Sequence, residues 1–242
     1  MRPLILVKYH FASLWNWRSS YLGRFIEPVA YLLFLATGLR SSLERTTGQY
    51  GLFVLTGMVC LLAFRAATAS MSDVANDRKW GVFAIYTLQG GSVLGYVASV
   101  VVFACSVFLG QFVVLVACAF AAFGDAVPEA HTLFAEAGLG LLLVVGWCGL
   151  GASVGGRVDS YSTRDLLVTV TTLPVILAAP LFYPIDDGWL RWVAAVNPLT
   201  YQVGVLREAS WLVAGATVLW TCFGVAVAVV SLRRAERVSR ER

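Results

Sequence analysis

Long apolar blocks follow one another along the chain, with short polar segments between them. Five blocks are long enough to cross a hydrocarbon core of about 30 Å as helices, which takes roughly 17 to 25 residues. They cover residues 52–72, 96–123, 137–156, 166–183 and 212–232. A shorter sixth block, 25–39, starts with Glu27 and Pro28, which suit a first helical turn. The pattern therefore predicts an all-α integral membrane protein with six transmembrane helices.

Composition agrees with this prediction. The 242 residues are 59% hydrophobic and 13% charged, with a mean hydropathy of +0.76. A soluble domain has about 25% charged residues. Because no polar block is long enough to fold separately, we expect residues 1–242 to form a single membrane-spanning domain.

Basic residues near helix ends indicate the orientation of the chain, since they are retained in the cytoplasm. Most of the 18 Lys and Arg residues fall on the side of the N-terminus if six helices cross the membrane. We therefore expect a multi-pass protein of the cytoplasmic membrane with both termini in the cytoplasm. Contact with the anionic inner leaflet explains the net charge of +4 without a nucleic acid partner.

The sequence offers no recognisable catalytic, cofactor or metal site. The five cysteines lie singly in apolar blocks, and the predicted topology puts His10 and His131 on opposite faces of the membrane. No nucleophile with a base and no set of convergent carboxylates is apparent. A P-loop needs a Gly-Lys pair, and neither Lys8 nor Lys79 provides one. We therefore predict that ATP and magnesium, if used, bind a partner.

The five long blocks contain no Asp or Glu. We therefore expect charged residues to be nearly absent from the spans. Arg65 is the exception, and two interpretations stay open. Its side chain could reach headgroups or a backbone carbonyl, or it could line a translocation path.

A short helix is predicted on the cytoplasmic side, between Ser72 and Tyr96. An apolar stripe with helical spacing supports it, formed by Trp80, Phe83, Ala84, Thr87 and Leu88. Gly90 and Gly91 would end the helix. Such a stripe fits either an interfacial helix that rests on lipid or a helix that docks a cytoplasmic partner.

A pair of short helices is predicted on the outer side, between Tyr183 and Leu212. Asn197 as N-cap and Pro198 at the first helical position would start the second helix. Each helix is too short to span, and Trp189, Trp192 and Tyr201 suit a membrane interface. We expect a re-entrant helical hairpin before the last span.

Three segments, "YGLFVLTGM", "DRKWGVF" and "NPLTYQVGVLRE", resemble the ABC type-2 transporter permeases, which include drug, lipo-oligosaccharide and polysaccharide exporters. The resemblance extends from an N-terminal amphipathic segment, expected to be an interfacial helix, to the basic tail. It implies a bacterial permease dimer, formed with a second copy or a paralogue, in which each permease holds a cytoplasmic ABC ATPase. The implied ATPase-coupling residues are Arg78, Lys79, Trp80, Gly81, Phe83 and Leu88. The implied outer gate comprises Trp189, Trp192, Asn197, Pro198, Leu199, Thr200, Tyr201 and Arg207.

One segment departs from the family pattern. Many members have Gly-Thr-Leu/Phe-Glu and then Ser-Pro in the coupling loop, whereas this chain has Gly81 to Ala84 and then Gly90-Gly91. The resemblance implies export of an amphipathic drug-like or lipid-linked compound. A polysaccharide or teichoic-acid-type exporter and a non-transporting membrane scaffold are the alternatives, the scaffold ranking lower because it would not need the outer hairpin.

Overall fold

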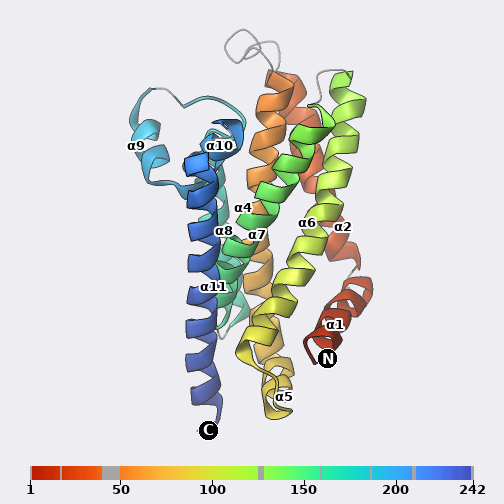
Figure 1. Cartoon of the computed structure of the whole chain (residues 1–242), viewed down its shortest axis with the longest axis vertical. Coiled ribbons are helices and arrows are strands. Elements are labelled where there is room, and N and C mark those ends of the chain that lie inside the picture. Colours follow the sequence, from red (N-terminus) through yellow and green to blue (C-terminus); the bar gives the residue numbers. More distant parts are fainter. Residues whose placement is uncertain are drawn as a thin grey trace.

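Helices make up all the regular structure that the computed structural model describes, namely residues 2–16, 18–39, 50–124, 128–158, 160–185, 187–208 and 211–240 (Figure 1). In chain order they are α1 (Arg2–Asn16), α2 (Arg18–Ala30), the π-helix η1 (Tyr31–Ala36), α4 (Tyr50–Lys79), α5 (Val82–Leu88), α6 (Val93–Phe123), α7 (Ala130–Gly155), α8 (Tyr161–Leu177), α9 (Trp189–Val196), α10 (Pro198–Glu208) and α11 (Trp211–Arg240). The all-α prediction is confirmed.

Five helical segments in the described part of the chain are long and apolar enough to cross a membrane: 21–39, 50–79, 93–122, 130–155 and 215–234. They match five of the six predicted spans. The predicted span 166–183 corresponds to α8, which has 17 residues and ends at Leu177, shortly after Pro174. Six spans therefore remain a prediction, which depends on whether α8 crosses the bilayer.

Helix α4 lies at the centre of the bundle and packs most extensively against α7. Glycines on α7 permit this contact, because a Cβ on Gly151 would overlap the backbone of Ala67 and one on Gly155 would overlap Met71. Small residues at such positions let membrane helices approach closely without a hydrophobic driving force. Gly151 and Gly155 thus serve packing within one chain.

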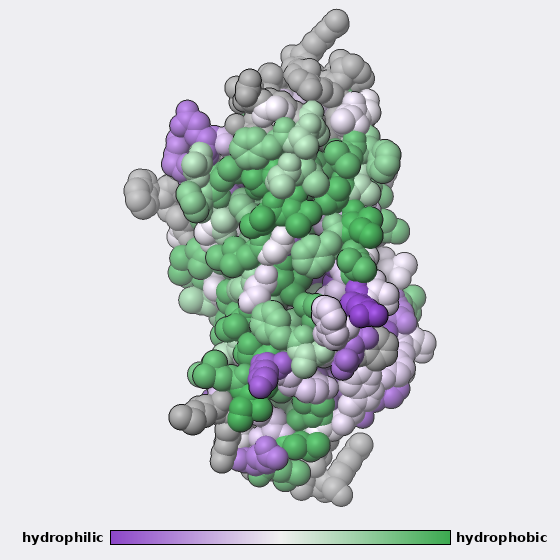
Figure 2. Space-filling view, turned by 90° about the vertical axis from the view of Figure 1, so that its right-hand side faces the viewer, coloured by the Kyte–Doolittle hydropathy of each residue, from purple (hydrophilic) through white to green (hydrophobic). Residues whose placement is uncertain are grey.

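Figure 1 shows both chain ends at the same end of the bundle as α5, with α9 and α10 at the opposite end. This arrangement agrees with the prediction that both termini face one compartment and the hairpin faces the other. Apolar residues cover much of the upper half of the face in Figure 2, and hydrophilic residues gather mainly in its lower half, toward α1 and α5.

The assignment of the α5 end to the cytoplasm makes a direct prediction. In a cysteine-free background, Asp187→Cys should react with an impermeant thiol reagent added outside intact cells, whereas Lys79→Cys should react only after the membrane is broken. Both positions are solvent-exposed, so access depends on the compartment. The opposite labelling pattern would contradict the proposed orientation.

The predicted blocks 52–72 and 137–156 contain no carboxylate, but helices α4 and α7 extend beyond them and carry carboxylates there. Helix α7 begins at Ala130, so Glu136 lies within it and is 3% exposed. Its carboxyl accepts a hydrogen bond from Thr56 Oγ1 on α4, at 2.8 Å. Helix α4 also continues to Lys79, and it therefore carries Asp73 and Asp77, which the sequence placed in a loop. A buried polar group is tolerated in such a helix because it finds a partner.

Candidate functional site

Two cavities adjoin one face of α4 in its inner half, and together they form what we call the α4 groove. The smaller has a volume of about 190 Å³ and the larger about 540 Å³. Both are lined by Arg24, Ser72 and Asp73, so they meet at these residues. Most α4 residues of the groove recur every three to four positions and share one helix face, namely Leu62, Arg65, Ala66, Ala69, Ser72, Asp73, Asn76 and Asp77. Thr68 and Ser70 lie at the two edges of that face.

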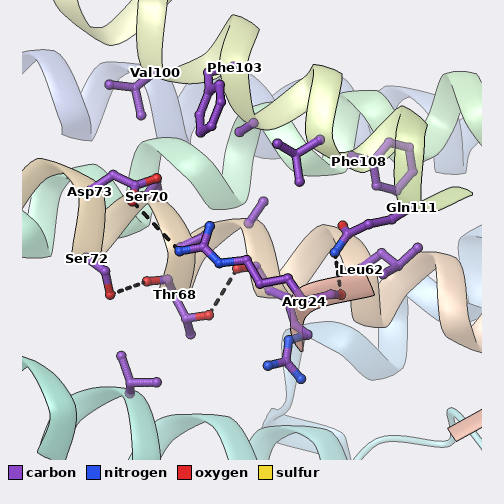
Figure 3. Close-up of a pocket in the computed structure, with 16 residues that line it drawn as sticks. Arg24, Leu62, Thr68, Ser70, Ser72, Asp73, Val100, Phe103, Phe108 and Gln111 are labelled. Atoms are coloured by element: carbon purple, nitrogen blue, oxygen red, sulfur yellow. Dashed lines mark hydrogen bonds and ion pairs between the residues drawn. The ribbon is translucent and has the colours of Figure 1, made fainter. Parts of the chain in front are cut away.

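The smaller cavity has a polar side and an apolar side (Figure 3). Arg24 of α2 and the hydroxyl residues Thr68, Ser70 and Ser72 of α4 supply the polar side. Helix α6 supplies the apolar side through Val100, Phe103, Ala104, Val107 and Phe108. The α4 hydroxyls donate to backbone carbonyls within or across helices, as helix-embedded Ser and Thr commonly do. The cavity can therefore accommodate a molecule that is polar on one side and apolar on the other.

Arg65 also lines the smaller cavity and forms an ion pair with Glu27 of α2. Its side chain is 23% exposed and that of Glu27 is 38% exposed. A cation within a span is expected to find such a partner, since an unpaired charge is costly in hydrocarbon. The structure thus brings Arg65 to the groove and also gives it a partner, Glu27, that the sequence analysis had considered only as a helix-starting residue.

The larger cavity lies between α1, α2, α4 and the start of α8. Tyr96 Oη of α6 donates a hydrogen bond of 2.8 Å to Asp77 Oδ2, and His10 Nε2 of α1 lies 3.8 Å from the same oxygen. His10 is 5% exposed and stacks on Phe103. Burial lowers the pKa of His10 to about 4, so the imidazole is neutral at pH 7. The stacking of His10 on Phe103 packs the N-terminal helix α1 against α6.

The inner ends of α4 and α8 are joined by polar and aromatic contacts. Trp80 Nε1 donates to Tyr161 Oη at 3.2 Å, and the Lys79 ammonium lies 3.5 Å from the centre of the Tyr161 ring. Arg164 donates to Asn76 Oδ1 at 3.0 Å, and Arg78 donates to the Gly156 carbonyl. The two cytoplasmic loops of the predicted topology therefore form one continuous surface.

The predicted coupling residues do not all lie on that surface. Phe83 is 3% exposed and packs edge-on against Tyr96, with ring centroids 4.9 Å apart. Phe83 therefore belongs to the core of its own chain, and its side chain does not face outward. On α5, Ile85 is 54% exposed and Leu88 is 79% exposed, and Trp80 just before the helix is 48% exposed. We call these three residues the coupling surface.

Glycine is favoured at position 81, just before α5, because of the backbone conformation there. Its φ is +75°, in the left-handed region that residues with a Cβ rarely adopt. This backbone geometry turns the chain between Lys79 at the end of α4 and Val82 at the start of α5. Gly81 therefore orients α5 and makes no side-chain contribution to a docking surface.

The outer hairpin has the predicted break. Asn197 Oδ1 accepts a hydrogen bond from the Leu199 N–H at 3.1 Å, and Asn197 Nδ2 donates to the Val175 carbonyl of α8 at 2.7 Å. Asn197 thus caps α10, whose first residue is Pro198, and ties the hairpin to α8. Trp189 and Trp192 are more than three-quarters exposed, as an interfacial position requires.

The remaining hairpin residues divide between surface and interior. Tyr201 is 62% exposed and donates to the Ala195 carbonyl at 2.6 Å, whereas Leu199 is fully buried. Arg207 donates to the Phe53 carbonyl at 2.9 Å and lies over the Phe53 ring, so it holds α10 to the outer end of α4. The buried hydroxyl of Thr200 has no hydrogen-bond partner among the described residues.

The sequence analysis missed four groove residues, namely Arg24, Asp73, Asp77 and Gln111. Asp73 and Asp77 had a signal in the sequence, because they are polar residues at helical spacing that continue the apolar run of α4. Within the described residues, no group of three or more His, Cys, Asp or Glu side chains could hold a metal ion. The groove combines charged, hydroxyl and apolar side chains, so it can contact a molecule that has both polar and apolar parts.

A bundle of membrane-length helices with a groove lined by polar and apolar residues is typical of a multi-pass membrane transport protein. A family model described as ABC-2 type transporter matches residues 4–211. The chain belongs to the ABC-2 type transporter family.

The curated relatives are distant but extend over most of the chain. Nodulation protein J of Rhizobium leguminosarum bv. viciae is 25% identical over 201 residues, which cover 78% of this chain and 74% of that protein. Its counterpart in R. leguminosarum bv. trifolii is 26% identical over 198 residues, covering 78% and 73%. The ycf38 protein of Porphyra purpurea, named as a candidate transport permease, is 23% identical over 210 residues, covering 84% and 71%.

Proposed function

We propose that this chain is the membrane-spanning permease subunit of an ATP-binding cassette exporter. It would move an amphipathic, drug-like or lipid-linked compound out across the cytoplasmic membrane, driven by a separate ATPase. The observation that carries the proposal is the α4 groove. It starts beside the coupling surface at the inner end of the bundle and continues along α4 to Arg65, inside a span.

The groove addresses the main energetic obstacle to export. Transfer of a polar headgroup into hydrocarbon without hydrogen bonds costs several kcal/mol. Arginine, carboxylate and hydroxyl groups along α4 would replace water around such a headgroup, and the apolar α6 side of the smaller cavity would accept the apolar part. The groove thus suits an amphipathic cargo better than a small ion.

The coupling surface is the proposed docking site for the ATPase. Exposed apolar residues at the aqueous end of a membrane protein favour a protein partner, since they gain from burial. Ile85 and Leu88 would supply the apolar anchors, and Trp80 would contribute beside them. Arg78 and Lys79, at the end of α4, would add charge next to these anchors.

A second permease would complete the assembly along α8. Leu166, Val170, Leu173 and Leu177 are each more than half exposed and recur at helical spacing. Helix α8 also borders the groove through Val168, Arg164 and Tyr161. A second copy or a paralogue packed against α8 would therefore enclose the route between two chains.

Nucleotide assays test whether ATP is bound and hydrolysed by the partner subunit and not by this chain. The purified chain should neither bind ATP tightly nor hydrolyse it, because no P-loop is present. ATP hydrolysis should appear only when the chain is reconstituted with the ABC ATPase encoded in its gene neighbourhood. Tight ATP binding by the chain alone, or failure of every neighbouring ATPase to associate with it, would overturn the proposal.

A further inference from the structure

Arg24 and Asp73 differ from the other charged residues of the α4 groove. Arg65 is paired with Glu27, Arg164 donates to Asn76 and Asp165, and Asp77 accepts from Tyr96. The guanidinium of Arg24 and the carboxylate of Asp73 form a loose ion pair with each other, at 3.8 Å, which is beyond hydrogen-bond distance. Neither group has a hydrogen bond with any other side chain in the described part of the chain, although their side chains are only 28% and 17% exposed.

The contacts of Arg24 position its side chain and leave its N–H donors without a hydrogen bond. Tyr21 stacks on the guanidinium at 4.5 Å, and stacking occupies the face of the group while its N–H donors point outward from the edge. Gln111 Nε2 donates to the Arg24 backbone carbonyl at 2.8 Å and so fixes the backbone of α2 against α6 (Figure 3). The Arg24 donors are therefore available to a ligand in the groove.

The position of the pair adds a second argument. Both residues line both cavities, so they face the point where the two meet. Apolar residues of α6, such as Phe103 and Val107, form one side of the smaller cavity beside them. A molecule at this junction would meet a hydrogen-bond donor cation, an acceptor anion and an apolar wall at the same time.

We propose that the Arg24–Asp73 junction binds the headgroup of a zwitterionic amphiphile, with its anionic group on Arg24 and its cationic group on Asp73. Arginine is suited to phosphate or carboxylate oxygens, which its planar guanidinium binds through two parallel hydrogen bonds. The carboxylate of Asp73 accepts hydrogen bonds from an ammonium group. Because one fixed charge of each sign faces the junction, a purely anionic or purely cationic headgroup would leave one of them unmatched.

This inference deepens the proposed route, since it names what the groove holds, but its test measures occupancy without transport. The purified full chain in a nonionic detergent is mixed with three dodecyl amphiphiles: dodecylphosphocholine, dodecyl phosphate and dodecyltrimethylammonium. Native mass spectrometry counts the molecules retained on the protein. Wild-type protein should retain the zwitterion best.

Variants then separate a zwitterion site from a site for one charge. Arg24→Gln should reduce retention of dodecylphosphocholine by roughly tenfold, the effect of losing one charge-assisted hydrogen bond to the phosphate. Asp73→Asn should also reduce retention, because the choline cation, which has no N–H to donate, loses the opposite charge beside it. Arg191→Gln, an exposed residue of α9 at the other end of the bundle, is the matched control and should bind as wild type. Unchanged unfolding temperatures would show that the variants remain folded.

Opposite effects of the two variants would overturn the proposal. Stronger retention of dodecyl phosphate by Asp73→Asn, without loss of the zwitterion, would indicate a simple anion site, and stronger retention of the cation by Arg24→Gln would indicate a cation site.

Two sources of the zwitterion are distinguishable. If phosphatidylethanolamine copurifies with wild type but not with the variants, the natural ligand is a bilayer lipid. If the wild-type site binds only the added amphiphile, the natural ligand is a transported compound. Loss of the site would leave ATPase binding by the coupling surface unaffected, so the two proposals fail separately.

Discussion

A double variant, Ile85→Asp with Leu88→Asp, is expected to abolish copurification of the ATPase while the chain stays inserted and folded. Both side chains are more than half exposed, so their replacement removes little from the core of the chain. Buried anchors at protein interfaces commonly cost more than about 2 kcal/mol each when truncated. Two charges in an apolar contact should therefore weaken ATPase binding by far more than tenfold, as measured by pull-down from detergent-solubilised membranes.

Two control variants make this expectation specific. Gln89→Asp adds a charge at the end of the same helix without removing an apolar residue, and it should retain the ATPase. Phe83→Ala should instead lower the unfolding temperature, because the ring is buried against Tyr96 and such truncations cost about 3–5 kcal/mol. Normal ATPase retention by the double variant would show that α5 is not the docking element.

Gly151→Ala is expected to disrupt the α4–α7 core. The added Cβ would lie 2.7 Å from the Ala67 carbonyl carbon and closer still to its oxygen, so the two helix backbones would have to separate. Overpacking of a core costs about 1–3 kcal/mol, and a backbone neighbour that cannot rotate away places this change at or above that range. The expected result is a marked fall in folded yield and in unfolding temperature measured in detergent.

Gly138→Ala is the matched control, since it lies on the same helix α7. A Cβ at Gly138 meets nothing within 4 Å, and alanine is the better helix former by about 1 kcal/mol in water. This variant should be as stable as wild type or slightly more stable. Equal loss of stability in both variants would contradict the packing of α7 on α4 through Gly151.

The spans and the Asn197 cap could be predicted from the sequence because their causes are local. Bilayer thickness sets the length of an apolar helix, and an N-cap acts on the next two residues. The extent of α8 was less predictable. Its apolar run continues to Tyr183, but the helix ends at Leu177, three residues after Pro174.

The orientation of α5 and most of the groove could not be predicted, because both depend on partners far away in the sequence. The stripe through Phe83 and Leu88 indicates a helix but does not say which side faces the protein. Tyr96 decides this, since it packs on Phe83 and also donates to Asp77. In the same way, the sequence placed Asp73 in a loop, whereas in the structure it lies on α4 beside Arg24 of α2.

Site-specific cross-linking can detect the proposed contact between α5 and an ABC ATPase in intact membranes. Leu88→Cys, in a cysteine-free chain coexpressed with its ATPase, is treated with a thiol-to-amine cross-linker in intact membranes, and the adduct is identified by mass spectrometry. We expect an adduct with the ATPase at Leu88→Cys and none at Val196→Cys, since Val196 is 81% exposed at the opposite end of the bundle. Absence of the adduct at Leu88, with cross-linking at Tyr161→Cys instead, would show that the ATPase docks on the α8 side and would contradict the proposed contact.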